Sequence, residues 1–505
     1  MDDPPETNPV DSLRVLVTGA SGYVGSRLVP PLLARDAEVR CLARSPEKLT
    51  AAAWRPSVEI ARGDVGGDLA EAMAGVDVAV YLVHSIGQGE GWTLREQDDA
   101  GNFARAAAAA GVRRIVYLGG LGRDTDLLSH HLQSRHDVGH VLASTGVEVV
   151  ELRAGVIIGS GSASFEMLRY LVEVLPVMVT PRWVETRCQP IAITDVVDLL
   201  VAAVTQTGTI GGIYEAGGPD VVTYAQMMAL YAETAGLARR RLIRVPFLTP
   251  RLSSLWVGLV TPVPVPLARE LVESLVNEVI VGSRSAVAAF SVRPMGLRES
   301  ISRALEATRG DIAATSFDDA GPDAFRPTPT DPAWSGGTVL TDVRSGQTAA
   351  GPDVVFGYLA QIGGRKGWYS GKTLWRLRGL FDQLLGGPGL RRGRRSTLAV
   401  GDPLDFWRVE DLVPGRRLRL HAEMRLPGDA WLTWDLEPVG PGTTVTQTAL
   451  FRPRGLLGRI YWVVVAPFHR FVFPGILGGL LAEADALARL PTRRGPPASA
   501  AKPAA

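Results

Sequence analysis

Four of the chain's seven histidines lie close together, in the stretch "SHHLQSRHDVGHVLASTG" at residues 129–146. They are His130, His131, His136 and His140. An imidazole can ligate a metal ion or exchange a proton near neutral pH, so this stretch could carry chemistry. If it forms a helix, the i, i+3, i+4, i+7 spacing gives it one packed face. That face is predicted to carry Val138, Val141, Leu142 and Thr145.

The helical spacing divides the histidines into two groups. At about 100° per residue, His131 and Arg135 fall on or beside the packed face. His136 and His140 fall on the opposite face, towards solvent or a neighbour, and the sequence gives them no evident third ligand. Because a metal site takes at least about three protein ligands, we predict no metal site here.

A second chemically informative stretch is "RVLVTGASGYVGSRLV" at 14–29, where a strand-like run ends and a helical pattern begins. Gly19 allows a tight turn, Gly22 a close backbone approach to a pyrophosphate, and Gly25 close packing of helix on strand. Free N–H groups at the start of the helix favour an anion. An ordinary strand-to-helix turn is the alternative. The predicted phosphate-binding residues are Gly19, Ser21, Gly22, Tyr23, Val24 and Gly25.

Cations follow the second strand-like run, where Arg44 stands next to Ala43 and Lys48 comes one turn later. A carboxylate at this point would accept the 2′-hydroxyl of an NAD ribose, whereas cations favour the 2′-phosphate of NADP. Arg44 and Lys48 therefore predict NADP(H), unless both are solvated surface residues. Asp64, followed by Val65, ends the third run and is predicted to contact the adenine, unless it is a turn residue.

The elements that must position these residues alternate along the first half of the chain. Apolar strand-like runs are separated by helical patterns such as 98–110, which is typical of a parallel sheet covered on both faces. The runs lie at 14–19, 38–43, 58–64, 76–83, 114–120 and 147–155. The predicted fold of residues 12–309 is therefore a doubly wound α/β, Rossmann-type sheet with an extension on the substrate side.

The pattern changes after residues 310–337, which are rich in Pro, Asp, Thr and Gly and predict a linker. Runs at 405–410, 416–424, 430–439 and 443–451 alternate apolar and polar residues, as in an antiparallel meander. A short helix is predicted around 354–362, and an apolar helical stripe follows at 476–487. Residues 338–490 therefore predict an α+β domain. The chain ends, 1–11 and 491–505, are expected to be disordered.

The bulk composition excludes several classes of protein. Lys plus Arg is 53 and Asp plus Glu is 52, so charge gives no reason to expect a nucleic-acid partner. Two cysteines allow neither a disulfide framework nor a zinc motif and suit the cytoplasm. The first ten residues do not resemble a signal peptide. The apolar stretches 252–268 and 461–482 contain prolines and, in the second, His469 and Arg470, so no integral membrane span is predicted. A peripheral membrane contact at 252–268 remains open.

Several motifs occur in the order seen in extended and atypical short-chain dehydrogenase/reductases. They are "TGASGYVG", "RGDV", "YLVHS" at 81–85, "ELRAGVIIG" at 151–159, "PIAITDVVDLL" at 190–200 and "YEAGGPD" at 214–220. Residues 12 to about 305 resemble most the atypical subgroup labelled NAD(P)-dependent epimerase/dehydratase. The resemblance implies NADP(H) at the C-terminal edge of the sheet, with His84 and Ser85 near the nicotinamide.

The resemblance also implies a Tyr-x-x-x-Lys pair, which this chain lacks. Counting back from Gly146 places His131 at the tyrosine position and Arg135 at the lysine position, and the usual serine is replaced within 119–122. A neutral imidazole at His131 could act as general acid or base, while Arg135 keeps a positive charge beside the ribose. Alternatively, both residues only hold the cofactor or pack.

Residues 338–490 resemble a family of unknown function that is itself similar to the START/polyketide-cyclase helix-grip (SRPBCC-like) superfamily. The resemblance rests on "IGGRKGWY" at 362–369, "LWRLRGLFDQLLGG" at 374–387, "VGDPLDFWRVE" at 400–410 and "AWLTWDLEP" at 430–438. Such folds enclose an apolar cavity. The tryptophans that could line it, or form the core, are Trp368, Trp375, Trp407, Trp431 and Trp434. The basic cluster at 390–396 is a solvated loop or a dock for an anion.

Together these observations favour an NADP(H)-dependent oxidoreductase-type enzyme that acts on a small apolar molecule with help from its C-terminal domain. The missing Tyr, Lys and Ser leave open a second hypothesis, a non-catalytic NADP(H)-binding redox regulator similar to NmrA-like proteins. The sequence defines neither the substrate nor an oligomeric state.

Overall fold

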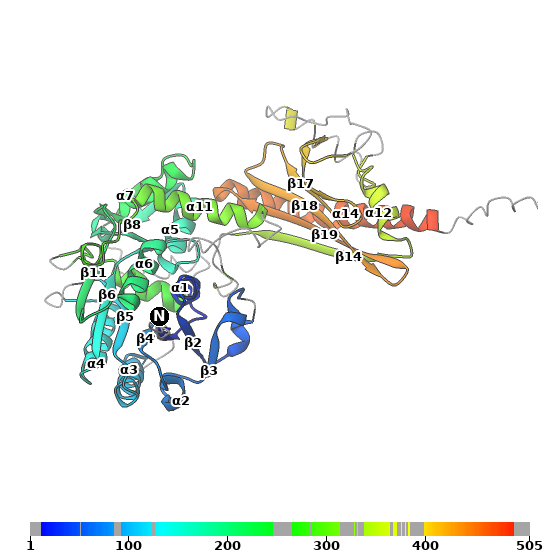
Figure 1. Cartoon of the computed structure of the whole chain (residues 1–505). Coiled ribbons are helices and arrows are strands. Elements are labelled where there is room, and N and C mark those ends of the chain that lie inside the picture. Colours follow the sequence, from blue (N-terminus) through cyan, green and yellow to red (C-terminus); the bar gives the residue numbers. More distant parts are fainter. Residues whose placement is uncertain are drawn as a thin grey trace, which may run out of the picture. The chain divides into compact units, whose positions relative to one another are not determined.

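The computed structural model divides into two compact units, Met1–Gly337 and Thr338–Ala505 (Figure 1). Each unit is described by itself. The residues that the structure describes are 12–50, 52–84, 92–122, 127–245, 265–282, 285–313, 328, 331, 338–363, 367–370, 375, 379, 382–383 and 398–488. Ser85, the basic cluster at 390–396 and most of the apolar stretch at 252–268 lie outside these residues.

The first unit is built on a seven-stranded sheet in the order β11-β6-β5-β4-β1-β2-β3. All neighbouring strands are parallel. The strands are β1 Arg14–Thr18, β2 Glu38–Ala43, β3 Glu59–Arg62, β4 Val78–Tyr81, β5 Arg114–Gly120, β6 Glu148–Ala154 and β11 Gly212–Ala216. The predicted doubly wound Rossmann-type sheet is confirmed, and its strand order reverses between β1 and β4. The edge strand β11 was not predicted from the sequence.

Period-two alternation buries both faces of this sheet. On β1, Val15 and Val17 belong to one apolar cluster, and Leu16 belongs to a second cluster on the other face. Helices cover each cluster: Leu28 of α1 packs into the first and Phe103 of α3 into the second. This arrangement explains why the strands read as continuous apolar runs.

Helices and short strands complete the first unit. The long helices are α1 Tyr23–Leu33, α3 Trp92–Ala109, α4 His130–Ala143, α5 Ala163–Val174, α6 Ile193–Thr205, α7 Tyr224–Thr234, α9 Val265–Ser274 and α11 Leu297–Ala313. The short helices are η1 Pro46–Leu49, η2 Arg55–Ser57, α2 Ala70–Met73, η3 Arg182–Glu185 and α10 Ala286–Ala289. Three two-stranded sheets pair β7 Ile157–Ile158 with β10 Ile191–Ala192, β9 Arg187–Cys188 with β12 Val222–Thr223, and β8 Val177–Thr180 with β13 Arg241–Arg244.

The segment predicted as a linker, 310–337, is not wholly a spacer. Helix α11 continues to Ala313, past the predicted start of the linker. Further on, the Asp331 carboxylate accepts two hydrogen bonds of 2.7 Å from the Arg27 guanidinium on α1, and both side chains are buried. Part of this segment therefore packs against the helix that begins at the predicted phosphate loop.

The second unit contains a six-stranded antiparallel sheet in the order β14-β19-β18-β17-β16-β15. The strands are β14 Leu340–Thr348, β15 Pro403–Leu404, β16 Trp407–Val413, β17 Arg417–Ala422, β18 Gly428–Val439 and β19 Gly442–Pro453. The predicted meander is confirmed, and β14, which was not predicted, closes it by pairing along β19. Helix α12 Pro352–Leu359 precedes the meander as predicted.

A single helix, α14 Gly455–Ala488, lies along β14 and β19 (Figure 1). Its C-terminal half packs into the core through Phe473, Ile476 and Leu480. An antiparallel sheet with a long helix is consistent with a helix-grip-like domain. The prolines do not interrupt the helix, because Pro467 and Pro474 both lie inside it. Within the described residues, α14 alone is long and apolar enough to cross a bilayer by length and composition, and 28% of its most apolar window is buried in the protein.

Candidate functional site

The glycine loop between β1 and α1 has the geometry of a phosphate cradle. Gly19 adopts a left-handed conformation with φ of 67°, and the Gly22 N–H donates to its carbonyl at 2.8 Å. A Cβ on Gly25 would lie 2.2 Å from the Gly19 oxygen, so only glycine lets α1 start this close to the strand. Gly22 is the N-cap of α1 and supplies no side chain to its first-turn amides. Those amides can therefore bind an external anion.

Tyr23 and Arg27 fix the first turn of α1. The Arg27 guanidinium carbon lies 4.1 Å from the centre of the Tyr23 ring, and Arg27 also donates to the Tyr23 carbonyl at 3.0 Å. The Tyr23 hydroxyl is buried without a hydrogen-bond partner among the described residues, and burial raises its pKa. Ser21 and Val24, the other predicted members of the loop, are both half-buried.

Thr18, which was not singled out from the sequence, joins the ends of β1 and β4. Its hydroxyl donates to the Val80 carbonyl and accepts from the Leu82 N–H, both at 3.0 Å. This bridge sets the path of the chain from β4 towards His84. A threonine at the end of a buried strand was the available signal, and it is a weak one because threonine is common in strands.

The predicted adenine-side residues gather at the ends of β2 and β3. Arg44 and Lys48 are exposed, and the Arg44 guanidinium lies 3.7 Å from the Asp64 carboxylate. Asp64 accepts the Val65 N–H at 2.8 Å. Val65 is buried, and its carbonyl accepts from the Asn102 amide at 2.8 Å. The Arg44 and Lys48 charges are thus open to solvent and stand where a 2′-phosphate is expected.

The first turns of α4 bring His131 and Arg135 to the C-terminal edge of the sheet. Ser129 caps the helix by accepting the Leu132 N–H at 3.3 Å. One turn later, the buried Arg135 guanidinium donates to the Leu118 carbonyl of β5 at 2.5 Å and lies 5.2 Å from the centre of the Tyr117 ring. The Tyr117 hydroxyl donates back to the Arg135 carbonyl at 2.9 Å. These contacts hold Arg135 rigidly beside β5.

Electrostatics keep both histidines at this edge uncharged. The pKa of His131 is lowered to about 3, first by burial and then by the nearby Arg135 charge and His84 ring. The pKa of His84 is lowered as well, by desolvation and by Arg135, but the His84 side chain is exposed to solvent, which limits the effect of desolvation. The structure thus brings His84, His131 and Arg135 into one electrostatic group.

Two nitrogens in this group have no hydrogen-bond partner within the described part of the chain. They are Nδ1 of His131 and Nη1 of Arg135, and both atoms are buried. Leaving a buried polar atom unpaired costs about 1–3 kcal/mol, and native proteins contain few such atoms. A polar ligand bound at this edge would supply the missing partners.

The sequence left two environments open for His136, solvent or a neighbour, and the structure shows the second. His136 is 1% exposed, and its Nε2 lies 3.0 Å from the Gly120 carbonyl. Strand β5 therefore contacts the face of α4 that carries His136. His130 and His140 are exposed. In the described ranges no group of three or more His, Cys, Asp or Glu side chains is placed to hold a metal.

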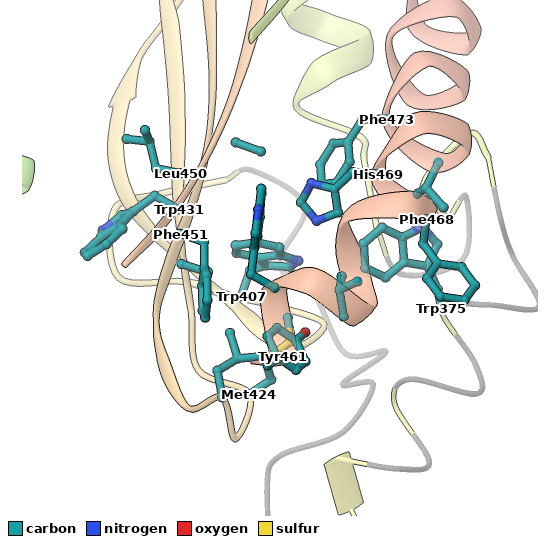
Figure 2. A pocket seen from close by; sticks show the side chains of 16 residues that line it. Trp375, Trp407, Met424, Trp431, Leu450, Phe451, Tyr461, Phe468, His469 and Phe473 are labelled. Carbon is teal, nitrogen blue, oxygen red and sulfur yellow. The ribbon is translucent and has the colours of Figure 1, made fainter. Parts of the chain in front are cut away.

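The second unit contains an apolar pocket of about 330 Å³ between its sheet and the N-terminal half of α14 (Figure 2). Strands β16, β18 and β19 supply one wall, and α14 supplies the other. The lining residues are Trp375, Trp407, Met424, Leu426, Ala430, Trp431, Ala449, Leu450, Phe451, Tyr461, Trp462, Val465, Phe468, His469, Val472 and Phe473.

The five predicted tryptophans divide between pocket and core. Trp375, Trp407 and Trp431 line the pocket. Trp368 and Trp434 do not, because each packs inside the domain and donates its indole N–H to a side chain. Their acceptors are Asp405 at 2.7 Å and Gln447 at 3.0 Å. Trp462 is a lining residue that was not predicted; it lies on a helix whose apolar pattern runs all the way round, so no face stood out.

A few polar atoms interrupt the apolar lining. The indole nitrogens of Trp375 and Trp407 and Nδ1 of His469 are buried without a hydrogen-bond partner in the described ranges. His469 Nδ1 lies 3.8 Å from the Asp342 carboxylate, beyond hydrogen-bond distance. Burial lowers the pKa of His469, so this ring is neutral near pH 7. The pocket is therefore an apolar space with a few directed polar groups.

Comparison with known proteins identifies the first unit. Residues 19–158 match the family described as NAD(P)H-binding. A (4-alkanoyl-5-oxo-2,5-dihydrofuran-3-yl)methyl phosphate reductase of Streptomyces griseus is 33% identical over 232 residues, which cover 44% of this chain and 74% of that protein. The chain belongs to the NAD(P)H-binding, short-chain dehydrogenase/reductase-like family. The nicotinamide dinucleotide predicted from the sequence is thereby confirmed.

Two further similarities concern other parts of the comparison. A 3-beta-hydroxysteroid dehydrogenase of Mycolicibacterium neoaurum is 38% identical over 129 residues. The match covers 23% of this chain and 34% of the length of the dehydrogenase. The crystal structure of an Escherichia coli NADPH-dependent quinone oxidoreductase with NADPH has a TM-score of 0.48 and 21% identity, covering 57% of this chain and 98% of that one. In the second unit, residues 334–476 match a protein of unknown function (DUF2867).

The residues of this NAD(P)H-binding family member fit the cofactor. The uncapped amides that follow Gly22 suit a pyrophosphate, and Gly25 lets the helix that carries them start close to β1. The unpaired nitrogens of His131 and Arg135 lie at the same sheet edge, where the nicotinamide half is expected.

Proposed function

We propose that this protein is an NADP(H)-dependent oxidoreductase that acts on a small apolar molecule. The observation that carries the proposal is that the phosphate cradle, after β1, and His131 and Arg135, beside β5, lie at the same C-terminal edge of one sheet. Both side chains present buried, unpaired nitrogens there. When bound, the cofactor supplies or accepts a hydride.

The chain's own residues then have distinct tasks. Arg135 holds a fixed positive charge, because Leu118 and Tyr117 lock its guanidinium in place. His131 is neutral near pH 7, since its pKa is about 3. A neutral imidazole donates a hydrogen bond to a substrate oxygen rather than a proton from an imidazolium. The proposed role of His131 is to polarise a carbonyl, with Arg135 as its charged neighbour.

The apolar pocket of the second unit supports the proposed class of substrate. Its lining is aromatic and aliphatic, which favours a lipophilic molecule. The unpaired indole N–H groups of Trp375 and Trp407 call for an acceptor oxygen on that molecule. An apolar ketone or quinone has both features, and the second unit would bind or present it.

Preference for NADP(H) over NAD(H) is part of the proposal and rests on Arg44 and Lys48. Replacing both by alanine should weaken NADPH binding by about 100-fold or more, because each charge-assisted hydrogen bond contributes about 1.5–3 kcal/mol. NADH binding should stay unchanged. Arg113→Ala, which removes an exposed arginine at the opposite edge of the sheet, is the control. Equal loss for both cofactors would contradict the assignment of these cations.

The enzymatic proposal is tested by NADPH oxidation with a panel of lipophilic ketones and quinones. Turnover with at least one compound is expected, and His131→Ala should lower kcat without changing the Kd of NADPH. Unchanged turnover in that variant would refute the role of His131.

A second candidate is a non-catalytic NADP(H)-binding redox regulator. The observation that favours it is the pKa of His131, which at about 3 leaves no strong proton donor on this residue. Under this hypothesis the protein binds NADPH and NADP⁺ with different affinities and turns over no compound of the panel. Calorimetric titration with each cofactor form, run beside the turnover assay, separates the two candidates.

The proposed location is the cytoplasm. Cys41 and Cys188 are both buried free thiols, which suits a reducing compartment. Measuring the distribution of the protein between cell fractions tests this part of the proposal.

A further inference from the structure

The N-terminal half of α14 carries a stripe of exposed apolar side chains. We call it the α14 stripe, and its seven members are between 40% and 76% exposed. The members are Leu456, Leu457, Ile460, Val463, Val464, Phe468 and Phe471. At about 100° per residue they fall within an arc of about 140° on one side of the helix. Large contiguous apolar patches on a folded protein mark interaction sites.

The opposite side of the same half-helix is already occupied. Tyr461, Val465 and His469 line the apolar pocket against the sheet. One side of the helix therefore serves the domain, and the stripe on the other side is exposed among the described residues, with Phe468 at its border also lining the pocket. The stripe is thus a second apolar face of the helix, separate from the face that packs towards the sheet.

The charges around the α14 stripe indicate which kind of partner covers the stripe. Residues 440–482 contain no Asp or Glu, but they contain Arg452, Arg454, Arg459 and Arg470. By helical geometry Arg459 and Arg470 both lie at one border of the α14 stripe. Arg470 is exposed, and Arg459 donates to the Thr338 hydroxyl at 3.0 Å. An apolar face bordered by arginines is the pattern of a helix that lies in the surface of an anionic bilayer.

A second copy of the chain would fit the α14 stripe less well than an anionic bilayer. If two stripes packed against each other, arginines at their borders would approach arginines, and residues 440–482 contain no carboxylate to neutralise them. A helix that crosses the bilayer is also a poorer match. Spanning would pull Phe473, Ile476 and Leu480 out of the core in which they are buried.

We infer that the α14 stripe docks on the headgroup–acyl boundary of an anionic lipid bilayer. The helix would lie in the plane of the membrane, with its pocket face turned to the protein and its stripe turned to the lipid. This inference does not depend on the cofactor site. It is also separate from the peripheral membrane contact at 252–268 that the sequence left open.

Vesicle sedimentation of the full-length protein tests the inference. We expect the protein to bind vesicles of phosphatidylcholine with phosphatidylglycerol, and to bind pure phosphatidylcholine vesicles more weakly. Changing Val463→Gln together with Phe471→Gln should weaken binding at least about tenfold, because two apolar side chains leave the membrane. The matched control, Val400→Gln with Val439→Gln, changes two exposed valines of the same unit outside α14 and should bind as the unchanged protein does.

Size-exclusion chromatography with light scattering and thermal unfolding accompany the assay. A folded protein that binds no vesicle overturns the inference. So does a dimer that the stripe variant dissociates, because a second copy would then cover the stripe. Equal binding by the stripe variant and the control variant, both folded, also overturns it.

Discussion

Replacing Gly25 by alanine is the sharpest test of the phosphate cradle. The new Cβ would stand 2.2 Å from the oxygen and 2.8 Å from the carbon of the Gly19 carbonyl. Both atoms belong to backbone, so the start of α1 must move away from β1 by on the order of 1 Å, with an overpacking cost of about 1–3 kcal/mol.

The same movement carries the first-turn amides away from the phosphates. Losing one charged hydrogen bond costs about 1.5–3 kcal/mol, so NADPH affinity should fall by about 10–100-fold. Calorimetric titration with NADPH measures the affinity, and urea unfolding measures the stability. Gly357→Ala is the control, since its Cβ meets no atom within 4 Å, and it should bind NADPH normally. A Gly25→Ala protein with unchanged affinity and stability would refute the cradle.

Three further predictions concern buried polar groups. The folded-state pKa of His131, about 3, lies below its ordinary value of about 6.5. The unfolded protein therefore takes up a proton first, so the folded state is favoured fully above pH 6.5 and loses stability as pH falls towards 3. His131→Gln should therefore reduce the loss of stability between pH 7 and pH 5 by about 2 kcal/mol in urea unfolding, and an unchanged pH profile would contradict the low pKa. Asp331→Ala leaves the buried Arg27 guanidinium without its carboxylate and should cost about 3–5 kcal/mol; a change below about 1 kcal/mol would show that the pair is solvated. Trp434→Phe removes the donor to the buried Gln447 and should cost about 1–3 kcal/mol without altering ligand binding, whereas a changed affinity for an apolar ligand would place Trp434 in the pocket after all.

The sequence was sufficient for the elements whose signal is local. The glycine spacing at 19–25 predicts a backbone approach that depends on those residues alone, and the structure places them accordingly. The apolar runs of the parallel sheet likewise follow from burial on both faces. The alternating runs of the meander follow from burial on one face. Strands β11 and β14 were missed for the opposite reason. Each is defined by a distant partner, β6 or β19, rather than by its own composition.

The site was less predictable because it depends on which elements meet. The spacing leaves His136 facing either solvent or a neighbour, and only the fold shows that it reaches the Gly120 carbonyl on β5. The lowered pKa of His131 depends on burial and on Arg135 and His84, which only the fold brings together. The sequence could not separate Trp407 in the pocket from Trp434 in the core, since both alternate correctly on strands of the same sheet.

The two prolines of α14 have a mechanical consequence. Pro467 and Pro474 lack the N–H groups that would bond to the carbonyls of Val463 and Arg470, four residues earlier. The backbone hydrogen bonding of α14 is therefore weakest between its exposed N-terminal half and its buried C-terminal half. At this point the N-terminal half can bend or unfold locally while the C-terminal half stays packed in the core. Amide hydrogen exchange should accordingly divide α14 into a fast portion before Pro467 and a slow portion after Pro474.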